Sequence, residues 1–156
     1  MPLRMTQAEV DAYTQKLSQW RSGVIPKAPG RRKKHGPCEF KLPEIRDGVM
    51  RTTLPIRVVN TANVREHWGE RNKRNQAHKD IVMQTIRGFT PPPPAVVRLV
   101  RIGPREMDSD GYTIALKAVR DAVAECFCLD DGSPLLQFEY AQERGEFGVR
   151  VEVRPR

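Results

Sequence analysis

The sequence predicts an α/β fold: a small mixed β-sheet with helices packed on one side. Three observations indicate it. Strand-like alternation at 50–58 precedes a helical segment that ends near residue 87. An apolar run at 95–102 precedes a second helical pattern at 110–126, and two further alternating segments close the chain. At 156 residues, the chain is long enough for one hydrophobic core and too short for two ordinary ones.

Residues 1–22 and 23–49 are expected to lie outside the main domain. Thr6 and Glu9 form a capping box that opens a helix. Apolar residues recur along it at helical spacing: Val10, Tyr13, Leu17 and Trp20. Residues 23–49 lack apolar periodicity, are rich in Pro, Gly and charge, and include the basic run 31–35. These patterns predict an amphipathic helical appendage followed by a basic linker or arm.

The main domain is expected at residues 50–156. Its first strand shows half-buried alternation, with inward positions at Thr52, Leu54, Ile56 and Val58. Pro55 suggests a sheet edge or an irregularity in this strand. The polar segment 60–76 leads into a helix that is expected to end around Arg87.

The second half of the domain supplies a strand, a helix and a hairpin. The segment 95–102 is apolar on both faces, which predicts a central strand. Residues 110–126 are predicted as one helix, whose apolar stripe is Leu116, Val119, Val123 and Phe127. The C-terminus is predicted as a β-hairpin with its turn at 143–146. The arms alternate at Leu136, Phe138 and Tyr140, and at Phe147, Val149, Val151 and Val153.

Charge is distributed unevenly along the chain, whose formal net charge is +8. Residues 1–107 hold 21 Lys and Arg against 9 Asp and Glu, whereas residues 108–156 hold 6 against 10. A basic half predicts a polyanionic partner, and an acidic half predicts a place where carboxylates are concentrated. A solvated basic surface explains the charge equally well, so the arrangement of the acids has to decide.

No stretch approaches the roughly 18–20 apolar residues of a membrane span, and the N-terminus lacks the apolar core of a signal peptide. A cytoplasmic protein is therefore the default expectation. The three cysteines, Cys38, Cys126 and Cys128, are odd in number and lack metal-ligand spacing. They are expected to be reduced packing residues rather than a disulfide framework or a zinc site.

The acidic residues that follow the predicted central strand carry the chemistry. Asp108 and Asp110 form a D-x-D pair at the strand end, and Lys117 follows Asp110 by two helical turns. Asp121, Asp130 and Asp131 complete the set of candidates. Clustered carboxylates repel one another unless a hard cation such as Mg²⁺ or Mn²⁺ compensates them. Such a metal activates water for phosphodiester hydrolysis, and a neighbouring lysine can stabilise the charge that develops on the phosphate.

Each part of this set also has an ordinary structural interpretation. A D-x-D pair alone is most often a helix cap or turn. Lys117 and Asp121, four residues apart on a helix, form a common surface ion pair, so Asp121 is expected to be structural. Only the full string of residues is specific.

That string, 107–111 followed by 115–121 and 129–131, resembles the signature of the RusA-like Holliday junction resolvases. In that family, two aspartates separated by one residue precede a helix with a lysine and an aspartate, and a second acidic pair follows the helix. The resemblance covers roughly residues 50–156 and implies a RusA-like fold. Two positions depart from the pattern: Gly111 stands where the family usually has asparagine, and Lys117 lies further from Asp108 than in the shortest members.

The resemblance implies metal ligation by Asp108, Asp110 and Asp131, with Lys117 as the catalytic lysine and Asp130 and Asp121 as secondary acids. It further implies a Mg²⁺- or Mn²⁺-dependent endonuclease that cuts branched DNA during recombination or repair, of phage or prophage origin. Because a four-way junction is two-fold symmetric and needs two nicks, a homodimer is expected.

Basic residues around the first predicted helix form the expected DNA surface, together with one residue after the central strand: Arg65, Arg71, Lys73, Arg74, His78, Lys79 and Arg105. A helix would align Arg71, Arg74 and His78 on one stripe, with Ala77 and Ile81 turned inward. Trp68 is expected in the core, with stacking on an exposed base as the alternative.

Two functions fit the sequence. The first is metal-dependent nicking of branched DNA. The alternative is a basic nucleic-acid-binding phage accessory protein whose acidic cluster is degenerate. Gly111 favours this alternative, because it stands where the resembled family usually has asparagine.

Overall fold

A computed structural model describes residues 36–60 and 64–156. Every described helix and strand belongs to one compact unit of the chain. The expected N-terminal amphipathic helix and the basic run 31–35 lie outside the described residues.

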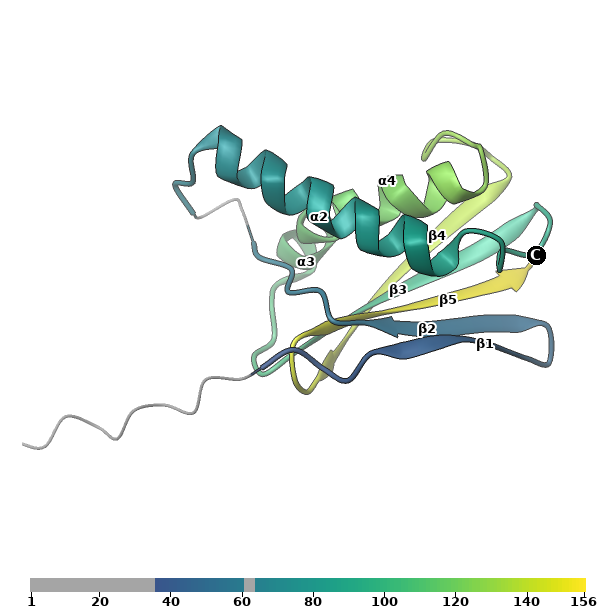
Figure 1. Cartoon of the computed structure of the whole chain (residues 1–156), viewed down its shortest axis with the longest axis horizontal. Helices are drawn as coiled ribbons and strands as arrows, with labels where there is room; N and C mark the ends of the chain where they lie inside the picture. The colour runs from purple at the N-terminus through teal and green to yellow at the C-terminus, as the bar shows by residue number, and fades with distance from the viewer. Residues whose placement is uncertain (1–35, 61–63) are drawn as a thin grey trace, which may run out of the picture. The chain divides into compact units, whose positions relative to one another are not determined.

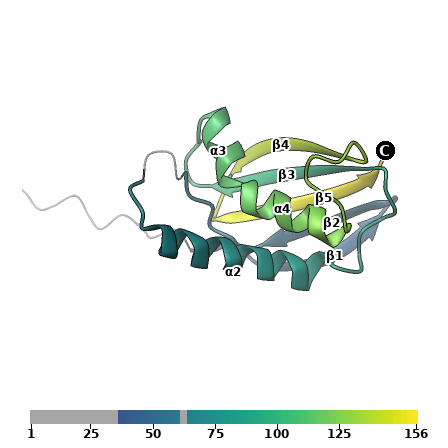
Figure 2. The ribbon, with the colours of Figure 1, turned by 90° about the horizontal axis from the view of Figure 1, so that it is seen from above.

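The domain is built on one mixed β-sheet. Its strands are β1 (Lys41–Arg46), β2 (Val49–Leu54), β3 (Ala95–Gly103), β4 (Leu136–Arg144) and β5 (Gly148–Pro155). They lie in the order β1-β2-β5-β3-β4, as the view from above shows (Figure 2). Only β3 and β4 run parallel, and every other neighbouring pair is antiparallel.

Three helices of the described residues pack on one face of this sheet, as the ribbon shows (Figure 1). They are α2 (Trp68–Ile86), α3 (Ser109–Ala115) and α4 (Lys117–Cys126). The core lies between the two layers, where Val82 of α2 and Val123 of α4 are fully buried against Leu99 of β3. The expected α/β fold, with a small mixed sheet and helices on one side, is confirmed. Among the described residues, no helix has both the length and the apolar character needed to cross a bilayer.

The central position of β3 is confirmed. It lies between β5 and β4, with Leu99 aligned to Val151 on one side and Tyr140 on the other. Both faces of the strand are covered, since Leu99 on the helix side and Val100 on the opposite side are fully buried. A strand that is covered on both faces reads as a continuous apolar run, which explains why the sequence located it.

The expected C-terminal hairpin is wrong. β4 and β5 are both strands, but each pairs with β3 rather than with the other. The connection passes around the end of β3, where the Gly145 N–H donates to the Gly103 carbonyl at 3.1 Å. Alternation identifies a half-buried strand but not the strand with which it pairs, and neighbours in sequence need not be neighbours in the sheet.

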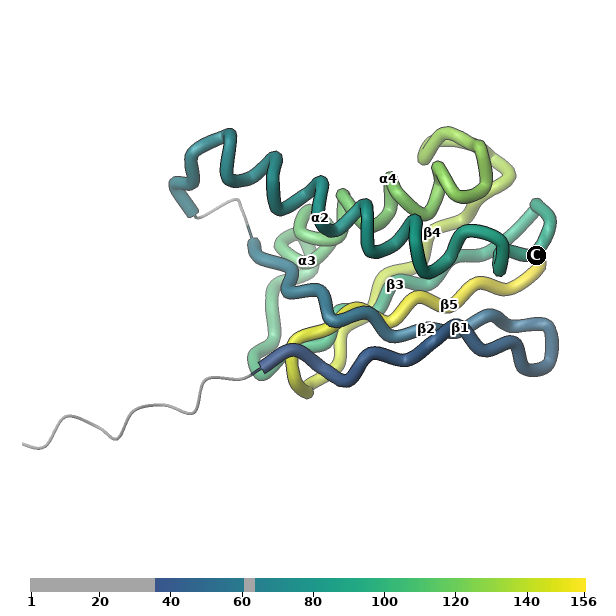
Figure 3. Tube along the Cα trace, in the orientation of Figure 1, coloured from purple at the N-terminus to yellow at the C-terminus, as the bar shows by residue number. Residues whose placement is uncertain are grey.

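The domain begins earlier than residue 50. β1 lies within the expected linker 23–49 and pairs antiparallel with β2 through a tight turn at Asp47 and Gly48 (Figure 3). Both turn residues have positive φ, 52° and 76°, as an Asp-Gly hairpin turn requires. β1 is an edge strand exposed on both faces, so it lacks the alternation by which strands are recognised.

The helix expected at 110–126 is two helices. α3 ends at Ala115 and α4 begins at Lys117, with the fully buried Leu116 between them at φ −84° and ψ −2°. The helix that was expected to end around Arg87 does so, since α2 stops at Ile86 and Arg87 is its C-cap residue.

Candidate active site and nucleic-acid groove

The loop after β3 delivers Asp108 and Asp110 to the start of α3. Asp108 is the N-cap residue, and its carbonyl accepts a hydrogen bond from the Tyr112 N–H at 3.2 Å. Its carboxylate makes no capping hydrogen bond, although aspartate is well suited to cap. Both carboxylates are exposed and have no cationic partner within the described residues. Two free acids at one helix start are available to a ligand.

Gln142 of β4 fixes this loop. Its side-chain amide donates to the Met107 carbonyl at 2.8 Å and accepts from the Met107 N–H at 3.0 Å. Arg101 of β3 donates to the Arg105 carbonyl at 2.8 Å and lies 3.4 Å from the Gln142 side-chain oxygen. Gln142 therefore holds both the N–H and the carbonyl of Met107, the residue immediately before Asp108.

Arg101 was not expected from the sequence to contribute. It is only 5% exposed, and burial lowers the pKa of its guanidinium group. The sequence does indicate that Arg101 faces the core, because the alternation of β3 places it on the same face as the core residues Val97 and Leu99. A charged residue at a core-facing position requires buried hydrogen-bond partners, and here they are the loop carbonyl and Gln142.

Gly111 packs directly against the Asp108 carboxylate. A Cβ atom at this position would touch Oδ1 of Asp108 and would lie 2.6 Å from Nδ2 of Asn60 and 3.0 Å from Cγ of Met107. The glycine that departs from the resembled signature therefore has a structural reason, because a side chain there would displace Asp108.

Lys117 and Asp121 form the ion pair that their spacing predicts. Nζ of Lys117 lies 3.2 Å from a carboxylate oxygen of Asp121, and the Lys117 side chain is 62% exposed. Nε of Arg120 lies 3.7 Å from the other oxygen of Asp121. Lys117 is thus placed at the surface, at the first residue of α4.

Asp131 lies in the turn after α4 and is paired with Arg120. A hydrogen bond with Asp130 lowers the pKa of Asp131, and the charges of Arg120 and Lys117 act in the same direction. Asp131 is therefore ionised at neutral pH. Arg120 also lies 3.5 Å from the Tyr140 hydroxyl of β4, which ties the turn to the sheet.

The candidate acids thus fall into two groups, one at the start of α3 and one along α4 and its following turn. Within residues 36–60 and 64–156, no three Asp, Glu, His or Cys side chains are placed to hold a metal ion together. Carboxylate oxygens are the donors that Mg²⁺ takes. Their chemistry suits the expected metal, but Asp108, Asp110 and Asp131 are not assembled as one set in this conformation.

A groove of about 790 Å³ runs between α2 and the pair α3 and α4. Basic, amide and apolar side chains line it: Val59, Arg71, Asn72, Lys73, Arg74, Asn75, Gln76, His78, Lys79, Ile114, Ala115, Lys117, Ala118 and Asp121. A second hollow of about 370 Å³ lies beyond α4 and includes Asp130 and Asp131. The two share Lys117 and Asp121, so that ion pair lies where the basic groove meets the acidic turn.

The expected stripe of Arg71, Arg74 and His78 does lie along one side of α2, where all three line the groove. Ile81 packs against the core as expected, but Ala77 is exposed and His78 is buried, so the expected inward position of Ala77 is wrong. Arg71 and Arg74 are half-buried beside His78, and Arg74 pairs with Glu66. The basic stripe therefore faces the groove rather than open solvent.

The remaining basic residues of the expected DNA surface are Lys73, Lys79, Arg65 and Arg105. Lys73 lines the groove and pairs with Glu70 at 3.2 Å, while Lys79 also lines it. Arg65 precedes α2 and Arg105 lies in the loop before α3, both exposed.

Trp68 is not in the core, contrary to expectation. It is the first residue of α2 and is 70% exposed. Its ring lies 5.7 Å from the ring of His67, the N-cap residue. A large exposed aromatic side chain is available for contact with a partner.

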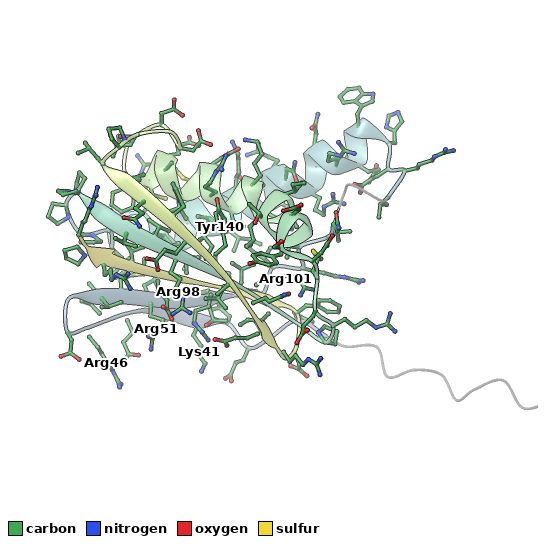
Figure 4. All side chains as sticks on the ribbon, turned by 180° about the vertical axis from the view of Figure 1, so that it is seen from behind. Lys41, Arg46, Arg51, Arg98, Arg101 and Tyr140 are labelled. Atoms are coloured by element: carbon green, nitrogen blue, oxygen red, sulfur yellow. The ribbon has the colours of Figure 1, made fainter. Side chains whose placement is uncertain are left out.

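The opposite face of the sheet also carries arginine side chains, among them Arg51 and Arg98 (Figure 4), and these are paired with glutamates. Arg51 and Arg98 both reach Glu152, at 3.0 and 3.8 Å. Arg154 pairs with Glu139 at 3.0 Å, and this face lies away from the helices. In the groove, Lys73, Arg74 and Lys117 are also paired with acids, but Arg71 and Lys79 have no ion pair within the described residues. Because these basic side chains line a hollow, the groove is the better candidate for binding a polyanion.

No protein-family model matches the chain, and no curated protein matches it.

Proposed function

We propose that this domain is a metal-dependent endodeoxyribonuclease that hydrolyses phosphodiester bonds in branched DNA. The observation that carries the proposal is α3, a helix of seven residues. Its N-cap Asp108 and its second residue Asp110 have carboxylates without an ion pair in the described part of the chain, and it ends with Ile114 and Ala115 in the wall of the basic groove. At a rise of about 1.5 Å per residue, Asp110 lies roughly 6 Å along the helix from Ile114. Acids and phosphate-binding groups are therefore within reach of one strand.

The chain's own residues supply distinct parts of this chemistry. Arg71, Arg74 and Lys79 along the groove attract the phosphate backbone. Lys117, at the acidic end of the groove, neutralises charge that develops on the phosphate. A Mg²⁺ or Mn²⁺ ion, when bound by Asp108 and Asp110, would supply Lewis acidity and an activated water.

A second candidate function is nucleic-acid binding without cleavage. The observation that favours it is the pairing of Asp131 with Arg120, together with the lack of a three-residue metal group in the described part of the chain. Arg120 therefore competes with a metal ion for the Asp131 carboxylate. If Arg120 keeps that carboxylate, the groove still binds DNA but no complete metal centre forms.

Metal-titrated nicking of a four-way junction separates the two candidates. The nuclease requires cuts that depend on Mg²⁺ or Mn²⁺ and disappear with chelation. The binding protein shifts the same junction in a gel but leaves both strands intact at every metal concentration.

The resolvase resemblance adds three expectations to this proposal: a homodimer that cuts two opposed strands, a four-way junction as the DNA partner, and a role in phage or prophage recombination or repair. These expectations rest on the sequence signature and on the two-fold symmetry of the junction.

A further inference from the structure

We infer that the groove between α2 and α3–α4 binds an unpaired strand of nucleic acid, with Trp68 as a stacking platform for one base at its open end. The inference deepens the proposed nuclease function, because it names the form of nucleic acid that the groove takes. It rests on three observations: the mixed lining of the groove, the arginine side chains in its wall, and the exposed Trp68, which lies on α2 one helical turn before the lining residue Asn72.

The lining of the groove suits bases as well as phosphates. Apolar groups from three segments line it, from Val59, from Ile114 of α3 and from Ala118 of α4. Asn72 and Asn75 of α2 place amide groups beside these apolar atoms. A duplex presents mainly phosphates to a groove of this kind, whereas an unpaired base offers an apolar face and a free hydrogen-bonding edge. Its volume, about 790 Å³, lies within the range of roughly 300–1,000 Å³ that small-ligand sites span.

Two arginines keep buried donors without partners in the described part of the chain. Nε of Arg71 and Nη2 of Arg74 are buried and make no hydrogen bond there, although both residues line the groove. An unsatisfied buried donor is costly, and charge-assisted bonds to phosphate oxygens are among the strongest that arginine makes. The two donors are three residues apart on α2, so they face the same side of the helix. Both atoms are covered by protein, so a phosphate in the groove would satisfy them only after the two side chains turn toward it.

Trp68 extends this wall of the groove by one helical turn. It precedes Asn72 by four residues and Asn75 by seven, the spacing at which side chains share one helix face. The neighbouring ring of His67 is fixed, because its Nδ1 accepts a hydrogen bond from the Gly69 N–H at 3.2 Å. An exposed indole at the end of a basic groove matches the way in which single strands are held, by stacking and backbone attraction without sequence reading.

The fluorescence of Trp68 provides the test. The chain has two tryptophans, so the Trp20→Phe variant leaves Trp68 as the sole reporter. We expect oligothymidylate to quench this fluorescence and to bind more tightly than a duplex of equal length. Trp68→Ala should weaken oligothymidylate binding roughly tenfold, as the loss of one stacked base does. Trp68→Phe should retain most of the affinity.

The matched control is Phe89→Ala, which removes an exposed aromatic side chain beyond the opposite end of α2 from Trp68. It should leave oligothymidylate affinity unchanged. The inference is overturned if Trp68→Ala binds the oligomer as tightly as the parent, or if duplex binds as well as single strand. It is also overturned if Trp68→Ala changes only the oligomeric state in light scattering, which would make Trp68 a protein contact. Quenching and tenfold weakening without cleavage of any junction would uphold the inference while the nuclease proposal fails.

Discussion

Gly111 couples the backbone of α3 to the Asp108 carboxylate. Alanine is the better helix former by up to about 1 kcal/mol, which offsets part of the cost of fitting a methyl group here. That methyl group would crowd the side chains of Asp108, Asn60 and Met107, so the Asp108 carboxylate has to move. We expect Gly111→Ala to lower the cleavage rate at least tenfold on a four-way junction, while the melting temperature shows that the domain still folds.

Gly132→Ala is the control for this substitution, because no atom lies within 4 Å of a Cβ placed there. It should cut at the parent rate. If both alanine variants cut equally well, the orientation of Asp108 has no part in the chemistry.

Replacement of Lys117 should affect the cleavage rate far more than the affinity for DNA. It is one cation among several along the groove, and its exposed ion pair with Asp121 contributes at most about 1 kcal/mol to stability. We expect Lys117→Ala to slow cleavage by on the order of 10²–10³, with little change in gel-shift affinity. A variant that cuts at near the parent rate would leave Lys117 as no more than the surface partner of Asp121.

His78 makes the stability of α2 depend on pH. Burial lowers its pKa below the ordinary value of 6.5, and the charge of Arg74 acts in the same direction. The folded state therefore resists the proton that the unfolded state accepts, so stability is lost as pH falls through about 6.5. Urea denaturation between about pH 7.5 and pH 5.5 should show this decrease.

His78→Gln keeps a polar side chain but cannot titrate. Its unfolding free energy should fall less over the same pH range than that of the parent. An identical slope for the two proteins would mean that His78 is as easily protonated when folded as when unfolded.

The elements of this fold differ in how much of them the sequence revealed. β3 was placed correctly because both of its faces are buried, whereas β1 was missed because almost every residue in it is exposed. The β4–β5 hairpin was expected because period-two alternation cannot show that β3 inserts between them. The break at Leu116 was missed because apolar periodicity continues through it.

The sequence predicts which residues belong to the candidate site but not how they are arranged in space. Asp108, Asp110 and Lys117 lie in one continuous string, so their presence near one helix start followed from sequence. The pairing of Asp131 with Arg120 did not follow, because it depends on how the turn after α4 folds back. Trp68 was assigned to the core because large aromatic residues usually bury, and nothing in its neighbourhood marks it as exposed.

At the scale of the whole molecule, the proposal requires two active sites. One chain supplies a single D-x-D pair, whereas resolution of a four-way junction needs two opposed nicks. We expect light scattering at micromolar concentration to give about twice the chain mass of 17.8 kDa. A protein that stays monomeric both alone and on junction DNA would remain a candidate nuclease but would not be a resolvase.

The most direct test of the nuclease proposal compares the parent protein with Asp108→Asn on one labelled four-way junction in Mg²⁺, with cleavage and binding measured in the same samples. Asp108 is exposed and has no ion pair within the described residues, so its replacement should leave the fold intact. Removal of one negative charge near the phosphates should abolish cleavage while binding is kept or strengthened. Cleavage by Asp108→Asn at the parent rate would contradict the metal-dependent site proposed for this domain.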